Sequence, residues 1–122
     1  DDFIFIMRAC YQKNIEKINI FVEKIAPKNN MQQEVFLKYA LKIIRDCMLY
    51  KYSPSLLLIN NKEREFINNF HQFVNGGNIV DITEKIELAI RFINRNANPK
   101  ILFFDLCLNL TKLINNKSKT LN

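Results

Sequence analysis

Apolar residues along this chain recur at intervals of three and four positions, which is the period of an α-helix with one face turned toward a core. The clearest case is the segment 79–96, where isoleucine and alanine follow this spacing throughout. The apolar run at 56–59 is shorter and fits either a helical turn or an extended segment. We expect an all-α bundle of about five to seven helices. The predicted helices span residues 3–11, 14–26, 30–51, 61–74, 79–96 and a last segment from Asn98 onward.

Two of these helices have recognisable start signals. Asn98 can accept a hydrogen bond from a backbone N–H in the first turn, and Pro99 fits the first helical position because its missing N–H has no partner there. In the helix before it, Asp81 followed by Glu84 resembles a capping box, although that helix could also begin near Asn78. The last helix is therefore predicted to begin at Asn98.

The last predicted helix carries apolar side chains almost all the way round. One apolar face consists of Ile101, Phe104 and Leu108, and the other of Leu102, Phe103, Leu106, Leu110 and Leu113. The polar residues Asp105, Asn109 and Lys112 share one narrow arc. A helix with two apolar faces needs neighbours on two sides, so it is either the central helix of a bundle or offers one face to another subunit.

A subunit contact through this helix has a defined set of candidate residues. The possible interface consists of Leu102, Phe103, Leu106, Leu110, Leu113 and Asp105. Asp105 stands out because it lies within an apolar stretch. It either lines a thin wet stripe with Asn109 and Lys112 or pairs with an arginine across an interface.

Composition narrows the fold further. A chain of 122 residues suits a single domain, here residues 1–122, with a core of its own. Two glycines and three prolines are too few turn residues for a many-stranded sandwich or barrel, and they exclude a glycine-rich phosphate loop. Because an apolar run near 20 residues is lacking, no membrane span is expected.

The net charge of +6 would suit an anionic partner such as nucleic acid or an acidic protein surface. However, the basic residues are interleaved with acidic ones, as in EKINIFVEK, and form no cluster with aromatic residues. A stand-alone basic helical module that binds nucleic acid is therefore the alternative interpretation.

Candidate chemistry is sparse. His71 is the only histidine and has no matching partner nearby, so we expect a structural or surface role for it. Cys10, Cys47 and Cys107 are widely spaced among apolar residues and lack a CxxC pattern, which is typical of buried, reduced thiols in a cytosolic protein. We expect no catalytic residue, no metal site and no cofactor-binding residue, and hence no enzyme activity in this segment.

The chain begins abruptly. Asp1 is followed almost at once by the apolar run FIFIM, without a convincing helix start. We therefore expect the sequence to be a fragment of a longer chain.

Three stretches together resemble one known family. They are RACYQKNIEKINIFVEKIA at 8–26, FLKYALKIIRDCML at 36–49 and, above all, NRNANPKILFFDLCLNL at 94–110. With them the chain resembles, over nearly its whole length, the C-terminal domain of the delta-prime subunit of bacterial DNA polymerase III clamp loaders, in a lineage-specific form. The shared features are packing and capping patterns and include no chemical signature.

This resemblance implies a non-catalytic role in DNA replication. In that family an AAA+ module precedes the helical domain, and the domain joins equivalent domains of the gamma/tau-type and delta-type subunits in a pentameric collar. The collar holds the cytoplasmic loader together, and DNA is contacted indirectly, through the assembled loader. Delta-prime acts mainly as a rigid stator and usually lacks a working ATPase. No residue of an ATP site falls within this fragment.

Overall fold

The computed structural model describes residues 2–53 and 61–115, and this part of the chain is helical with short connecting turns. The elements are α1 (Asp2–Gln12), α2 (Ile15–Ile25), α3 (Asn30–Tyr52), α4 (Asn61–Phe70), the 3-10 helix η2 (His71–Phe73), α5 (Ile79–Asn94) and α6 (Pro99–Ile114). Six α-helices within the described ranges confirm the all-α prediction and the expected number of helices. The apolar run at 56–59 lies outside the described residues.

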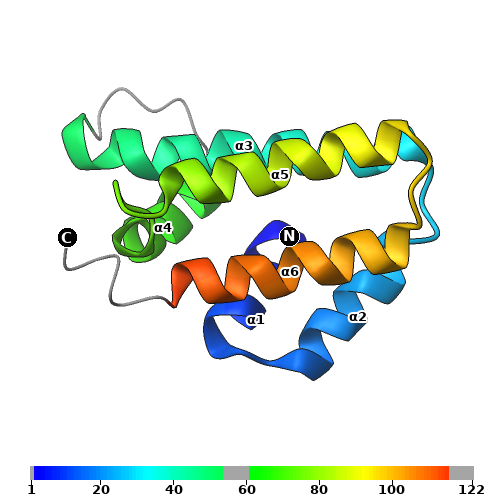
Figure 1. Ribbon diagram of the computed structural model, residues 1–122. Coiled ribbons are helices and arrows are strands. Elements are labelled where there is room, and N and C mark those ends of the chain that lie inside the picture. The colour runs from blue at the N-terminus through cyan, green and yellow to red at the C-terminus, as the bar shows by residue number, and fades with distance from the viewer. Residues whose placement is uncertain (1, 54–60, 116–122) are drawn as a thin grey trace.

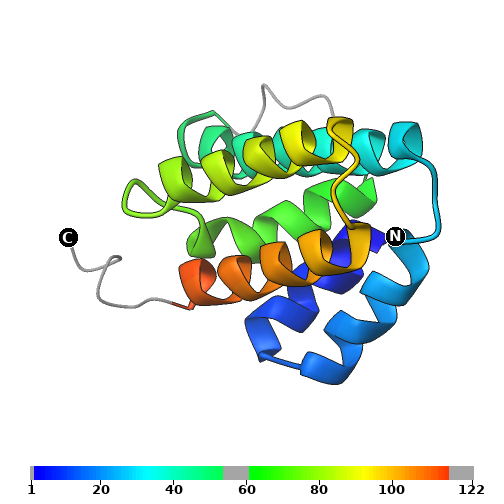
Figure 2. The same cartoon turned by 45° about the vertical axis from the view of Figure 1, so that its right-hand side comes forward.

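Helix α6 lies in the middle of the bundle. In Figure 1 it runs between α5 on one side and the pair α1 and α2 on the other, and it contacts all three. Helix α3 lies alongside α5, and α4 packs against α3; Figure 2 shows both pairs from a second side. The two-sided apolar pattern of the last predicted helix thus has neighbours within its own chain. None of the described helices is long and apolar enough to cross a bilayer.

Aromatic rings dominate the core where α6 passes α2 and α3. The Phe103 ring is fully buried and lies 6.1 Å from the Phe21 ring and 6.4 Å from the Phe36 ring, both measured between centroids. A void of about 20 Å³ remains beside these rings, close to Ile86. Such a small void leaves the core well packed, so most side chains around it are held on all sides.

The start of α6 agrees with its sequence signal, whereas the start of α5 does not. The Asn98 side chain accepts a hydrogen bond from the Ile101 N–H at 3.2 Å, and Pro99 is the first helical residue. In α5 the predicted capping box at Asp81 is wrong, because the helix begins two residues earlier at Ile79 and Asp81 lies inside its first turn. The alternative start near Asn78 is confirmed.

Asn78 acts as a connection between two chain segments. Its amide oxygen accepts a hydrogen bond from the Asn75 N–H at 2.9 Å. Its amide nitrogen donates to the carbonyl of Phe73 at 2.8 Å and to that of Leu113, in the last turn of α6, at 3.2 Å. Asn78 is buried. Its bond to Leu113 links the start of α5 to the end of α6, and its other two bonds hold the turn that precedes α5.

Gln33 makes a similar connection between α2 and α3. Its buried side-chain amide nitrogen lies 3.2 Å from the carbonyl oxygens of Ile25 and Ala26 and 2.9 Å from that of Lys28. Carbonyl groups at the end of a helix lack an intrahelical donor, and Gln33 supplies one from the next helix. The angle between α2 and α3 is therefore set partly by a hydrogen-bonded side chain.

Candidate functional site

The turn between α5 and α6 determines how these two helices face each other. The Ala97 N–H donates to the Phe92 carbonyl and the Asn96 N–H donates to the Ile93 carbonyl, both at 3.0 Å. This pair of bonds is the Schellman motif, and it requires a left-handed residue after the helix. Asn96 takes that conformation, with φ of 60°, and asparagine tolerates it better than most residues do. The chain therefore reverses over residues 95–98 and lays α6 antiparallel to α5.

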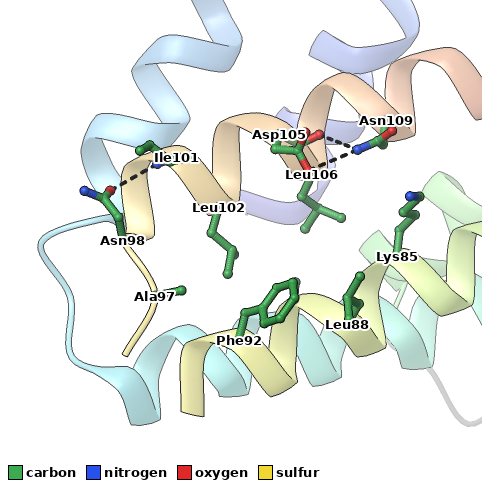
Figure 3. Close-up of a pocket in the computed structure, with 11 residues that line it drawn as sticks. Lys85, Leu88, Phe92, Ala97, Asn98, Ile101, Leu102, Asp105, Leu106 and Asn109 are labelled. Atoms are coloured by element: carbon green, nitrogen blue, oxygen red, sulfur yellow. Dashed lines mark hydrogen bonds between the residues drawn. The ribbon is translucent and has the colours of Figure 1, made fainter. Parts of the chain in front are cut away.

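A groove of about 310 Å³ lies between α5 and α6 and is open to solvent. Its floor and walls are mainly apolar, with polar groups at the rim (Figure 3). The lining residues are Lys85, Leu88, Ala89, Phe92, Ala97, Asn98, Ile101, Leu102, Asp105, Leu106 and Asn109. On each helix they recur at intervals of three and four positions, so each helix contributes one continuous strip.

The end of the groove next to the turn is apolar. Figure 3 shows Phe92 of α5 and Leu102 of α6 pointing toward each other across it, with Ala97 at the end. Phe92 is 41% exposed and Ile101, beside Leu102, is 70% exposed. Large apolar side chains thus remain in contact with water on both walls.

Charged groups lie farther from the turn. Lys85 projects from the α5 wall, and Asp105 lies on the α6 wall, where its carboxylate accepts a hydrogen bond from the Asn109 amide at 3.2 Å. Among the described residues, no ion pair engages either Lys85 or Asp105. Lys85 and Asp105 thus place opposite charges on the two walls, neither of them in an ion pair with another described residue.

The predicted interface residues fall into two groups. Phe103, Leu106 and Leu110 are buried in the core of this chain, because α1, α2, α3 and α5 cover that side of α6. They leave little surface for a neighbouring subunit. Leu102 and Leu113 are half-buried, and Asp105 is exposed. The predicted subunit contact itself stays a prediction.

Asp105 lies on the wet stripe that the sequence indicated. Lys112 is exposed as well, and Asn109 is half-buried between them. Pairing of Asp105 with an arginine across an interface stays a prediction. The α5 wall with Lys85, Leu88 and Phe92 was not predicted, although these residues share one strip at helical spacing.

His71 occupies a structural position away from the groove. Its ring lies 4.9 Å from the Tyr50 ring, and it is half-buried on η2. Burial lowers the pKa of His71 below its ordinary value, and the positive charge of Lys51 adds to this effect. The structural or surface role expected for His71 stays a prediction.

All three cysteines are free and buried, as predicted. The Cys10 thiol donates to the Cys107 carbonyl at 3.5 Å, which ties α1 to α6. Burial raises the pKa of Cys47 to about 12. Residues 2–53 and 61–115 contain no group of three or more residues of the metal-binding types.

Comparison with known proteins leaves the fold and this groove as the main guides to function. No family model, no curated protein and no solved structure matches the chain.

Proposed function

We propose that this chain is the non-catalytic assembly domain of a bacterial clamp-loader subunit of the delta-prime type. The observation that carries the proposal concerns the stretch NRNANPKILFFDLCLNL. It bears most of the resemblance to that family, and it also supplies the turn and the α6 wall of the groove. The same residues thus account for the family resemblance and for the exposed apolar surface near Ile101.

In this role the helical bundle joins the collar domains of gamma/tau-type and delta-type subunits in the cytoplasm. The residues of this domain hold the ring together and perform no chemical step. An AAA+ module preceding them in the parent chain takes part in gripping primer-template DNA, so that DNA reaches this domain only through the assembled loader.

The test compares the full-length parent protein with a variant that lacks residues 1–122 of the present numbering. Each is mixed with purified gamma/tau-type and delta-type subunits of the same organism and analysed by size exclusion. We expect the full-length protein to co-elute with the loader and the deletion variant to elute separately, with its AAA+ part still folded by circular dichroism. A deletion variant that still co-elutes as a complete loader would refute the assembly role.

A further inference from the structure

The α5–α6 groove has the arrangement of a protein contact site. Its centre is lined by apolar side chains such as Phe92 and Leu102, and its rim carries Lys85, Asp105 and Asn109. An apolar centre with a polar rim is the usual arrangement of protein interfaces. Burying the exposed apolar surface of Ile101 and Phe92 would be favourable, because it removes that surface from water.

The shape of the groove suits the side chains of a helix. Two antiparallel helices form its walls, and a third helix can lay an apolar strip between them, with residues at intervals of three and four positions as anchors. The volume of about 310 Å³ is at the lower end of small-molecule pockets, which are roughly 300–1,000 Å³. That space accommodates a few side chains, and the open outer side leaves room for the backbone that bears them.

The charges on the two walls specify the partner further. Lys85 lies on the α5 wall and Asp105 on the α6 wall, and neither has an ion-pair partner within the described ranges. A complementary helix therefore places a carboxylate on the flank that faces α5 and a basic side chain on the flank that faces α6. Complementary charges at a rim fix orientation and exclude wrong partners.

We propose that the groove receives an amphipathic helix of a neighbouring loader subunit, with its apolar strip between Phe92 and Leu102, an acidic residue facing Lys85 and a basic residue facing Asp105. This inference rests on the proposed assembly function. It identifies the contact surface as the outer strip of α5 and α6, including Leu102 and Asp105. The buried face of α6 packs within the core of this chain and is not part of the proposed contact.

The first variant exchanges the two rim charges. Lys85→Glu combined with Asp105→Lys keeps the net charge and the apolar centre, but it places like charges opposite each other in the complex. We expect the affinity of the full-length parent for the purified gamma/tau-type or delta-type subunit to fall about tenfold or more, measured by titration of a fluorescently labelled parent protein. Circular dichroism verifies the fold.

The second variant targets the apolar end. Ile101→Asp puts an unpaired charge at the contact, while an acidic residue in the first turn of α6 is favourable for the helix itself. We expect it to weaken binding about tenfold or more as well. The matched control is Ile15→Asp, since Ile15 is an exposed isoleucine in the first turn of α2, on the other side of α6 from α5.

The outcomes separate this inference from the proposed function. Folded groove variants that bind like the wild type, while deletion of residues 1–122 abolishes assembly, would overturn the groove assignment and leave the assembly role intact. Binding lost equally in Ile15→Asp would also overturn it. Self-association of the isolated chain that Ile101→Asp abolishes would assign the groove to a second copy instead.

Discussion

Two buried amide side chains, Gln33 and Asn78, hold helix ends together where apolar packing provides no hydrogen bonds. The Gln33 amide donates hydrogen bonds to carbonyl groups at the end of α2, and the Asn78 amide donates one to a carbonyl in the last turn of α6. Unpaired polar groups inside a protein cost free energy, so each amide stabilises through the backbone groups that it satisfies. The buried Gln33 amide oxygen has no hydrogen-bond partner among the described residues, which reduces the gain at that position. The partners of Gln33 lie at the end of α2 and in the turn after it, whereas Asn78 has one distant partner, the Leu113 carbonyl, and two in the preceding turn.

Asn78→Ala should therefore destabilise the protein. The change leaves the Asn75 N–H and the Phe73 and Leu113 carbonyls without their side-chain partner, and we expect a loss of about 1–3 kcal/mol in the free energy of unfolding. Urea denaturation followed by circular dichroism measures it. The control Asn69→Ala alters an exposed asparagine and should change stability by less than about 0.5 kcal/mol. Equal effects of the two substitutions would show that the Asn78 bonds contribute little.

His71 should make stability depend on pH. Because burial lowers its pKa in the folded state, the unfolded chain binds a proton at a higher pH than the folded chain does. The contribution of His71 to the free energy of unfolding is complete above the pKa of histidine in the unfolded chain, about 6.5. This contribution is lost as the pH falls through the lower pKa of the folded state. The melting temperature should decrease between pH 7 and pH 5, and less steeply in His71→Gln. Parallel pH profiles of the two proteins would contradict this assignment.

At the scale of helices, the sequence predicted well which residues form each helix, but it predicted poorly which other helices each one packs against. Periodicity and caps are local, so α6 could be predicted to start after Asn98. The predicted capping box at Asp81 is wrong because α5 already begins at Ile79, and the N-cap residue Asn78 makes no side-chain capping bond that a local motif could reveal.

The residues that line the groove were also only partly predictable from the sequence, because the groove forms between two helices. Leu102 and Asp105 could be singled out from the composition of their helix, but Lys85 and Phe92 could not, because the outer strip of α5 looks like ordinary solvated surface. Their relevance depends on the antiparallel pairing set by the 95–98 turn. The inward position of Phe103 likewise depends on α2 and α3 covering it.

Ile86→Ala tests the packing of α5. Ile86 is 1% exposed in the middle of the helix and lies beside the small core void. Removing its side-chain atoms enlarges this void, so we expect destabilisation of about 2–5 kcal/mol by chemical denaturation. Val80→Ala, at an exposed position of the same helix, serves as the control. A loss below about 0.5 kcal/mol for Ile86→Ala would mean that this face of α5 carries little of the core.

For the whole molecule, the positive charge is distributed over the surface and partly paired. Lys24 contacts Asp2 at 2.8 Å and Lys100 contacts Glu23 at 3.1 Å, each pair linking two helices. Exposed pairs of this kind add little stability, but they reduce the local positive potential. The net charge of +6 therefore does not by itself create a nucleic-acid surface.

The isolated chain should accordingly bind duplex DNA only weakly. We expect dissociation constants around 10⁻⁴–10⁻⁶ M, typical of non-specific contacts, with a steep loss of binding as salt increases. Fluorescence anisotropy with labelled duplexes of different sequence at two salt concentrations provides the measurement. Nanomolar, sequence-dependent binding at physiological salt would favour the nucleic-acid-binding alternative over the assembly role.

The contacts between α1 and α6 determine when this domain can complete its fold during synthesis. The Cys10 thiol bonds to Cys107, 97 positions later, and the Asn115 amide donates to the Cys10 carbonyl at 3.1 Å. At ribosomal speeds of about 5–20 residues per second, roughly 5–20 s pass between the synthesis of Cys10 and that of Cys107. Once α1 has emerged from the ribosome, its apolar side that α6 will cover remains accessible until α6 emerges and packs against it. The bundle is therefore completed late, after its last helix has left the ribosome.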